Sequence, residues 1–268
     1  MALPVWYANF QWEGAVGSDW RWPACGVLIY LVIVGVLTQL MKSRPAFEFK
    51  SFTVFHNMVL SLGSLAMFVG TILELQSRFR SSGSLEWFFC ESMTARADGA
   101  LYFWSYIYYL SKYYEMIDTV LVLLQKSRVP HFKLQVYHHA AVVPMAWFWC
   151  EQRQSLQWGG LLFNTLVHVI MYQYYAFRVL GLPTPWKRWI TKLQITQFTT
   201  SFALLAGTLY VYRQKTAAGD SCAGMQALLY NCLFNATLLL QFVGVDKRNA
   251  ELAGKGKARG DKAEEKTQ

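Results

Sequence analysis

Seven apolar stretches, each about as long as a membrane-spanning helix, constrain the fold of this chain more than any other feature. A helix needs roughly 20 mostly apolar residues to cross the hydrocarbon core of a bilayer. The stretches cover residues 24–41, 53–75, 100–124, 135–150, 156–178, 190–212 and 224–245. Only 15% of the residues are charged, against about 25% in soluble domains. We therefore predict an all-α polytopic membrane protein with seven transmembrane helices.

Lys and Arg in the connections predict how the chain is oriented. They concentrate in the connections on the same side as the C-terminal tail, and such an excess is typical of the cytosolic side. We therefore expect a lumenal segment at residues 1–23, the membrane domain at residues 24–245 and a disordered basic cytosolic tail at residues 246–268. The first residues lack a basic n-region, so we predict no cleavable signal peptide. The net charge of +9 does not indicate nucleic acid, because no helical face collects it.

Three ionisable residues lie within the third apolar stretch. Lys112, Glu115 and Asp118 follow one another at steps of three, so neighbouring members can touch on a helix. The lysine can neutralise one acid, while the other carboxylate accepts a hydrogen bond from an imidazole on a neighbouring helix. An ion pair that only fixes helix packing is the alternative. Ionisable groups inside a membrane more often mark a functional site.

The next three stretches add histidines and amides. Gln135 and His138 share one face of the fourth helix, and His139 is rotated from His138 by about 100°. We therefore expect only one of the two histidines to face a shared reaction centre. The sixth stretch carries Gln194 and Gln197 near its start. Their side-chain amides can either hydrogen-bond between helices or bind a polar part of a ligand. A polar stripe on the fifth helix consists of Asn164, His168, Met171, Tyr172 and Tyr175.

These histidines can serve either a metal or acyl chemistry. The chain has five, His56, His131, His138, His139 and His168, with no HExxH or CxxC spacing, so we predict no metal. Neutral imidazole can act as a base or a nucleophile. Burial disfavours the imidazolium and keeps the lone pair available. A histidine nucleophile needs an activated acyl donor such as a thioester.

Four motifs follow in order: KYYEMIDT at 112–119, QVYHH at 135–139, HVIMYQYY at 168–175 and TKLQITQ at 191–197. Their order and spacing resemble the ELO family of very-long-chain fatty acid elongases. The resemblance implies a 3-oxoacyl-CoA synthase of the endoplasmic reticulum membrane, with its N-terminus lumenal and its C-terminus cytosolic. Six of the seven helices would surround a narrow acyl-chain tunnel. The enzyme would condense acyl-CoA with malonyl-CoA, release CO2 and CoA, and need no bound cofactor.

The resemblance also implies roles for single residues. His138 would accept the acyl group as an acyl-imidazole, and His168 would assist decarboxylation of the malonyl unit or deprotonation. Lys112, Glu115 and Asp118 would orient and polarise the histidines, including His139. Asn164, Tyr172 and Tyr175 would line the site, and family members join two lumenal loops by a disulfide, which matches Cys90 and Cys222.

Substrate and partners follow from the same resemblance. The family often has histidine where this chain has Gln135, and the QxxHH variant resembles elongases of polyunsaturated chains; saturated or monounsaturated acyl-CoA is the alternative. The cytosolic cations Lys126, Arg128, Lys187 and Arg188 are candidates for binding CoA phosphates. Topology and lipid headgroups explain them equally well. The expected partners are membrane lipids and the 3-oxoacyl-CoA reductase, dehydratase and enoyl reductase of the elongation cycle, and a homodimer stays open.

Two other classes of protein share this topology. A seven-span receptor would not need the charged residues and three histidines of the apolar stretches. A proton-coupled transporter could use Asp, Glu and His as a relay. Transporters commonly show repeated halves or broken helices, and the sequence indicates neither.

Overall fold

A computed structural model describes residues 5–127 and 131–264. The described residues form helices and contain no strand, apart from two isolated β-bridges, Gln11↔Asp98 and Ser92↔Cys222. The helices are α1 (Val5–Ala8), α2 (Arg21–Leu40), α3 (Lys50–Ser82), α4 (Glu86–Phe89), α5 (Gly99–Glu115), α6 (Ile117–Leu124), α7 (Phe132–Glu151), α8 (Gln157–Leu180), α9 (Lys187–Ala217) and α10 (Met225–Glu264). The fold is therefore all-helical, as the sequence predicts.

Each predicted apolar stretch overlaps a long helix, and the third is divided between α5 and α6. Among the described residues, three helical segments are long and apolar enough to cross a membrane by themselves: Arg21–Leu40, Lys50–Ser82 and Met225–Arg248. The other long helices carry amides, histidines and charges, which lower their mean hydropathy. Those polar groups gather inside the bundle, as described below.

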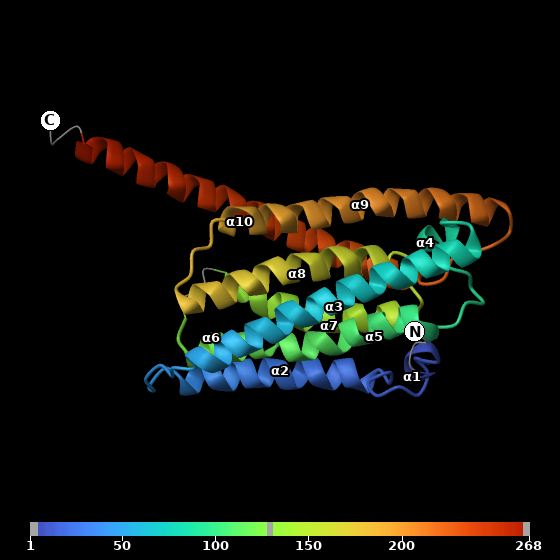
Figure 1. Cartoon of the computed structure of the whole chain (residues 1–268), viewed down its shortest axis with the longest axis horizontal. Helices are drawn as coiled ribbons and strands as arrows, with labels where there is room; N and C mark the ends of the chain where they lie inside the picture. The colour runs from blue at the N-terminus through green and yellow to red at the C-terminus, as the bar shows by residue number, and fades with distance from the viewer. Residues whose placement is uncertain (1–4, 128–130, 265–268) are drawn as a thin grey trace.

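The long helices lie side by side in one elongated bundle (Figure 1). Helix α3 packs most extensively along α8, and further contacts join α8 to α9, α9 to α10, α10 to α7, α7 to α5 and α5 back to α3. This order of contacts closes a ring of six helices. Helix α2 stands outside the ring against α6 and α7.

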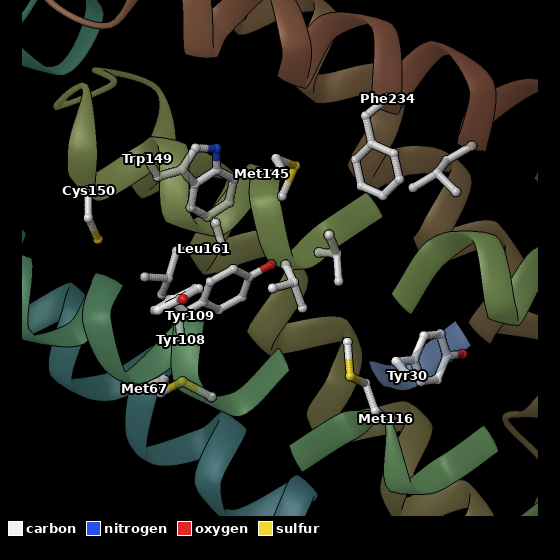
Figure 2. Close-up of a cluster of buried hydrophobic side chains, with 14 of the residues drawn as sticks. Tyr30, Met67, Tyr108, Tyr109, Met116, Met145, Trp149, Cys150, Leu161 and Phe234 are labelled. Carbon is white, nitrogen blue, oxygen red and sulfur yellow. The ribbon is translucent and has the colours of Figure 1, made fainter. Parts of the chain in front are cut away.

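Large aromatic side chains hold α5 against α7 inside the ring. Tyr108 and Trp149 are almost completely buried, and their rings stack 5.2 Å apart at an angle of 13°. Figure 2 shows Met145 of the same core near these rings. Buried aromatic residues contribute most to core packing because each removes a large apolar area from water or lipid. The packing fixes the faces of α5 and α7 that carry Lys112 and His138.

A disulfide closes one end of the bundle, which we call the disulfide end. The opposite end, where α6 ends, is called the α6 end. Cys90 follows α4 and is bonded to Cys222, which precedes α10, with 5.0 Å between their Cα atoms. Beside it, the Ala223 amide donates to the Glu91 carbonyl oxygen at 2.9 Å. The buried Glu91 carboxylate pairs with Arg78 at 2.7 Å. These contacts tie α3, α4 and the α9–α10 connection together.

The sequence predicts a disordered tail at residues 246–268. Helix α10 continues to Glu264, and its last turns project beyond the other helices (Figure 1). The segment is rich in Ala, Glu and Lys, which have high helix propensity, and also contains Gly254, Gly256 and Gly260, which have low helix propensity. Extending an existing helix also avoids the cost of nucleating a new one.

Candidate active site

The candidate site begins at a break between α5 and α6. Met116 separates the two helices, and its amide donates to the Tyr113 carbonyl oxygen, three residues back, at 3.2 Å. Thr119 repeats this shorter spacing with the Met116 carbonyl oxygen at 3.2 Å. Such a tightened turn within a helix often marks a functional position. Asp118, in the first turn of α6, makes contacts separate from those of Lys112 and Glu115. The sequence predicted one continuous helix.

Lys112 and Glu115 form a buried ion pair. Lys112 Nζ lies 2.7 Å from Glu115 Oε1, and each side chain is only 1% exposed. The ammonium also donates to Asn164 Oδ1 at 3.1 Å and lies 3.9 Å from the centroid of the Tyr108 ring. The Tyr108 hydroxyl donates to the same Asn164 oxygen at 3.0 Å. These partners replace the water that the ammonium would otherwise need.

The predicted histidine of α8 joins this pair from the neighbouring helix. His168 Nδ1 lies 3.5 Å from Glu115 Oε1. Ser111 donates to the same oxygen at 3.4 Å. A carboxylate in this place can orient the imidazole and stabilise its protonated form during a reaction. The structure therefore brings together Lys112, Glu115, Asn164 and His168, which sequence analysis named separately.

Asp118 belongs to a second set of contacts. Its Oδ2 accepts a hydrogen bond from the Tyr172 hydroxyl at 2.7 Å, and its Oδ1 lies 2.8 Å from His56 Nε2. The expected bond from a carboxylate to an imidazole on a neighbouring helix is present, but the imidazole is that of His56 on α3. His56 carries no role in the sequence prediction. The signal was its position in an apolar stretch, where an imidazole is costly unless it is used.

His138 reaches a cavity enclosed by α5, α7, α8, α9 and α10. The ring stacks against Phe234 of α10 with centroids 5.9 Å apart. Part of the cavity is open to solvent, and its lining is mostly apolar. It extends toward the disulfide end as far as Trp149 and Leu156. Trp149 follows His138 by eleven positions on α7, so the cavity follows this helix for about 16 Å.

His139 faces different neighbours. Its ring meets the Tyr30 ring of α2 edge-on, with centroids 6.3 Å apart, and it is absent from the cavity lining. The Tyr30 hydroxyl shares a hydrogen bond with Thr119 at 2.9 Å. The two adjacent histidines therefore have separate surroundings, and His138 alone of the pair lines the cavity. Gln135 is half-buried, one turn before His138 on α7.

The remaining predicted residues of the site lie around this centre. Gln194 Nε2 donates to Met171 Sδ at 3.8 Å, which links α9 to α8. Gln197, one turn farther along α9, lines the cavity. The Tyr175 ring lies edge-on to the Tyr172 ring, with centroids 6.0 Å apart.

The predicted phosphate-binding cations lie at the α6 end. Lys126 borders a small pocket with Lys42 and Ser127. Lys187 and Arg188 begin α9 and are exposed. Arg128 lies outside the described residues. Within the described residues, no three His, Cys, Asp or Glu side chains are grouped as metal ligands.

Comparison with known proteins identifies the family. The profile of the ELO family, described as GNS1/SUR4, matches residues 15–245. The chain belongs to the ELO family. It is 35% identical over 209 residues to "Fatty acid elongase sre1" of Dictyostelium discoideum, which covers 77% of each chain. It is 30% identical over 230 residues to "Fatty acid elongase 4" of Trypanosoma brucei brucei, covering 84% of this chain and 82% of the relative.

A more distant relative gives the same family. The chain is 28% identical over 233 residues to "Putative fatty acid elongase 1" of Schizosaccharomyces pombe, covering 85% of this chain and 68% of the relative. The ELO match includes both networks around Met116, the cavity and the disulfide. Family membership and the apolar helices together fit a multi-pass membrane protein.

Proposed function

We propose that this chain is a fatty acid elongase that condenses a long-chain acyl-CoA with malonyl-CoA to give 3-oxoacyl-CoA, CO2 and CoA. One observation carries the proposal: the His138 imidazole opens onto a long apolar cavity next to a buried network of charged residues. Neutral imidazole attacks thioesters when water is excluded. The names of the relatives support the same reaction class.

In the first step, a ring nitrogen of His138 attacks the thioester carbonyl carbon. The new N–C bond replaces the C–S bond, and the departing CoA thiolate takes the proton that the imidazole loses. The acyl chain extends from His138 toward Trp149 and Leu156. This apolar lining favours a hydrocarbon chain because it removes the chain from water. The product of the step is a neutral acyl-imidazole.

In the second step, malonyl-CoA loses CO2 and becomes an enolate, with its negative charge shared by the thioester oxygen and the carbon next to the thioester carbonyl. That carbon attacks the acyl carbonyl, the N–C bond to His138 breaks, and the imidazole recovers a proton. His168, held by Glu115, and the Lys112 ammonium supply positive charge and proton donors for the developing anions. Glu115 positions both the His168 ring and the Lys112 ammonium, and Asn164 also binds the ammonium. His139, on the α2 side, lies edge-on to the His138 ring with centroids 5.4 Å apart and can hold that ring in place.

The proposed membrane arrangement has seven helical spans, with α5 and α6 forming one of them. Its disulfide end faces the lumen of the endoplasmic reticulum and its α6 end the cytosol, an orientation that the excess of Lys and Arg in the connections at the α6 end supports. CoA then binds at the cytosolic end, where Lys126, Lys187 and Arg188 can meet its phosphates. The six-helix ring supports an acyl tunnel between these helices. The 3-oxoacyl-CoA product then passes to the reductase, dehydratase and enoyl reductase of the elongation cycle.

Amides in the cavity support a polyunsaturated substrate. Asn231 of α10 is only 9% exposed and lines the cavity, as does Gln197 of α9. Neither side chain hydrogen-bonds to a described residue. An amide N–H beside the chain can make a weak contact with the π electrons of a cis double bond, which a saturated chain does not offer. Gln135, which replaces a histidine of the family motif, agrees with this substrate class.

Radiolabelled malonyl-CoA and a panel of acyl-CoAs test the proposal with purified protein. We expect an acyl-CoA-dependent 3-oxoacyl product, formed faster from polyunsaturated chains than from saturated ones. His138→Ala should abolish it, while Gln135→Ala, the matched control one turn away, should reduce it less. Equal loss in two folded variants would contradict the role of His138.

The same assay separates a proton-coupled transporter from an elongase. The break at Met116 is a feature that such transporters share. Absence of product from every chain length, together with proton-coupled uptake in liposomes, would favour the transporter.

A further inference from the structure

His56 makes a buried polar contact with Asp118 that has no part in the two reaction steps proposed above. Its side chain is 0% exposed, and its ring packs against the Tyr114 ring with centroids 5.0 Å apart. Nε2 lies 2.8 Å from Asp118 Oδ1, while Nδ1 is buried and meets no hydrogen-bond partner among the described residues. A buried polar side chain is costly unless its contact serves the fold or the site.

The surroundings define which form of the imidazole fits. An imidazolium would leave the Nδ1–H group buried without an acceptor, whereas neutral imidazole leaves only a lone pair there. The neutral form that carries its proton on Nε2 therefore donates to Asp118. Asp118 is then an acceptor on both oxygens, from His56 on α3 and from Tyr172 on α8. Three helices meet at this carboxylate.

The second acceptor bond connects His56 to the site. The Tyr172 hydroxyl donates to Asp118 at 2.7 Å, and the Tyr172 ring lies edge-on to the His168 ring at 5.3 Å and 86°. By contrast, His56, Asp118 and Tyr172 are all absent from the lining of the cavity that His138 faces. The contacts of His56 therefore lead to the His168 side of the site and not to the acyl cavity.

We propose that His56 is a positioning residue for the condensation step: by fixing Asp118 it holds Tyr172 beside His168. This role rests on the proposed elongase function. Because the acyl cavity lies elsewhere, loss of the His56 bond impairs reaction with malonyl-CoA and leaves transfer of the acyl group to the enzyme intact. A residue that only stabilises the fold would affect both half-reactions alike.

The test measures the two half-reactions separately on the purified full chain. CoA released from an acyl-CoA without malonyl-CoA reports acyl transfer, and incorporation of radiolabelled malonyl-CoA reports the complete reaction. For His56→Leu we expect acyl transfer within about 2-fold of wild type. Losing a hydrogen bond to a charged acceptor predicts a roughly 10- to 100-fold fall in kcat for condensation.

Two further variants sharpen the result. His56→Gln keeps an N–H donor for Asp118, so it should recover part of the lost condensation rate. His56→Leu combined with Tyr172→Phe should be no slower than the slower single variant, because both act through Asp118. Thr71→Val, a buried position on α3 whose hydroxyl has no partner in the described chain, is the matched control and should leave both half-reactions unchanged.

Equal loss of both half-reactions in His56→Leu would overturn the positioning role. So would a Gln variant no better than the Leu variant, or multiplicative losses in the double variant. If wild type releases no CoA and incorporates no malonyl unit, the proposed function fails, and the role of His56 falls with it.

Discussion

The Lys112–Glu115 pair gives the sharpest prediction about the stability of the bundle. Both groups are 99% buried and lie 2.7 Å apart. Removing one partner of a buried ion pair costs about 3–5 kcal/mol, because the other charge stays behind unpaired. In Lys112→Met, His168 and Ser111 still face Glu115, which places the expected loss near the lower value, about 3 kcal/mol.

Replacing both charges should restore most of that stability. Hydrophobic residues of similar volume in place of a buried ion pair often leave stability nearly unchanged, and a Gln at position 115 keeps a neutral hydrogen-bonding group beside His168 and Ser111. We expect Lys112→Met combined with Glu115→Gln to unfold within about 1 kcal/mol of wild type, although it should not elongate. The single variant should melt about 6–12 °C lower, taking 2–4 °C per kcal/mol for a domain of this size.

Thermal unfolding of detergent-solubilised protein, followed by tryptophan fluorescence, measures both effects. Glu115→Gln alone completes the double-mutant cycle, and the pair should show a coupling free energy of at least about 1 kcal/mol. Additive losses, or a single variant as stable as wild type, would refute the reasoning that the two charges compensate each other in a dry interior.

Two further predictions concern the disulfide end. The Cys90–Cys222 bond joins residues that are 132 positions apart in the sequence. For a loop of that size, Cys90→Ser should lower the free energy of unfolding by about 4–5 kcal/mol. The variant should melt at a lower temperature than wild type, and reductant should not lower that temperature further. In Gly160→Ala, the added Cβ would lie 2.8 Å from Trp149 Cη2, so Trp149 should move into the cavity. Elongation of the longest accepted acyl-CoA should fall roughly 10-fold relative to shorter ones, and an unchanged chain-length profile would contradict the assigned path.

Apolar composition predicts the long helices because a bundle in a bilayer carries apolar side chains on its outer surface, as α2 does with Leu28, Ile29 and Val32. Helical spacing predicts that Lys112 and Glu115 can touch, whereas the approach of His168 to this pair was implied only by the family resemblance. The break at Met116 could not be predicted, since steps of three fit a continuous helix. Its position depends on partners from other helices: Asp118 is held by His56 and Tyr172, which are distant in sequence.

Two other features of the site could not be predicted from the sequence, each for a different reason. His56 had a visible signal, an imidazole in an apolar stretch, but no motif spacing linked it to Asp118. The separation of His138 from His139 follows from helix geometry, whereas Phe234 as the ring under His138 required the packing of α10 against α7.

Mass spectrometry of the enzyme quenched after incubation with acyl-CoA alone shows whether His138 carries the acyl group. We expect one acyl group bound to the peptide that contains His138, absent from His138→Ala and lost again when malonyl-CoA is added before the quench. An acyl group on any other side chain, or an unmodified enzyme that still turns over, would contradict this expectation.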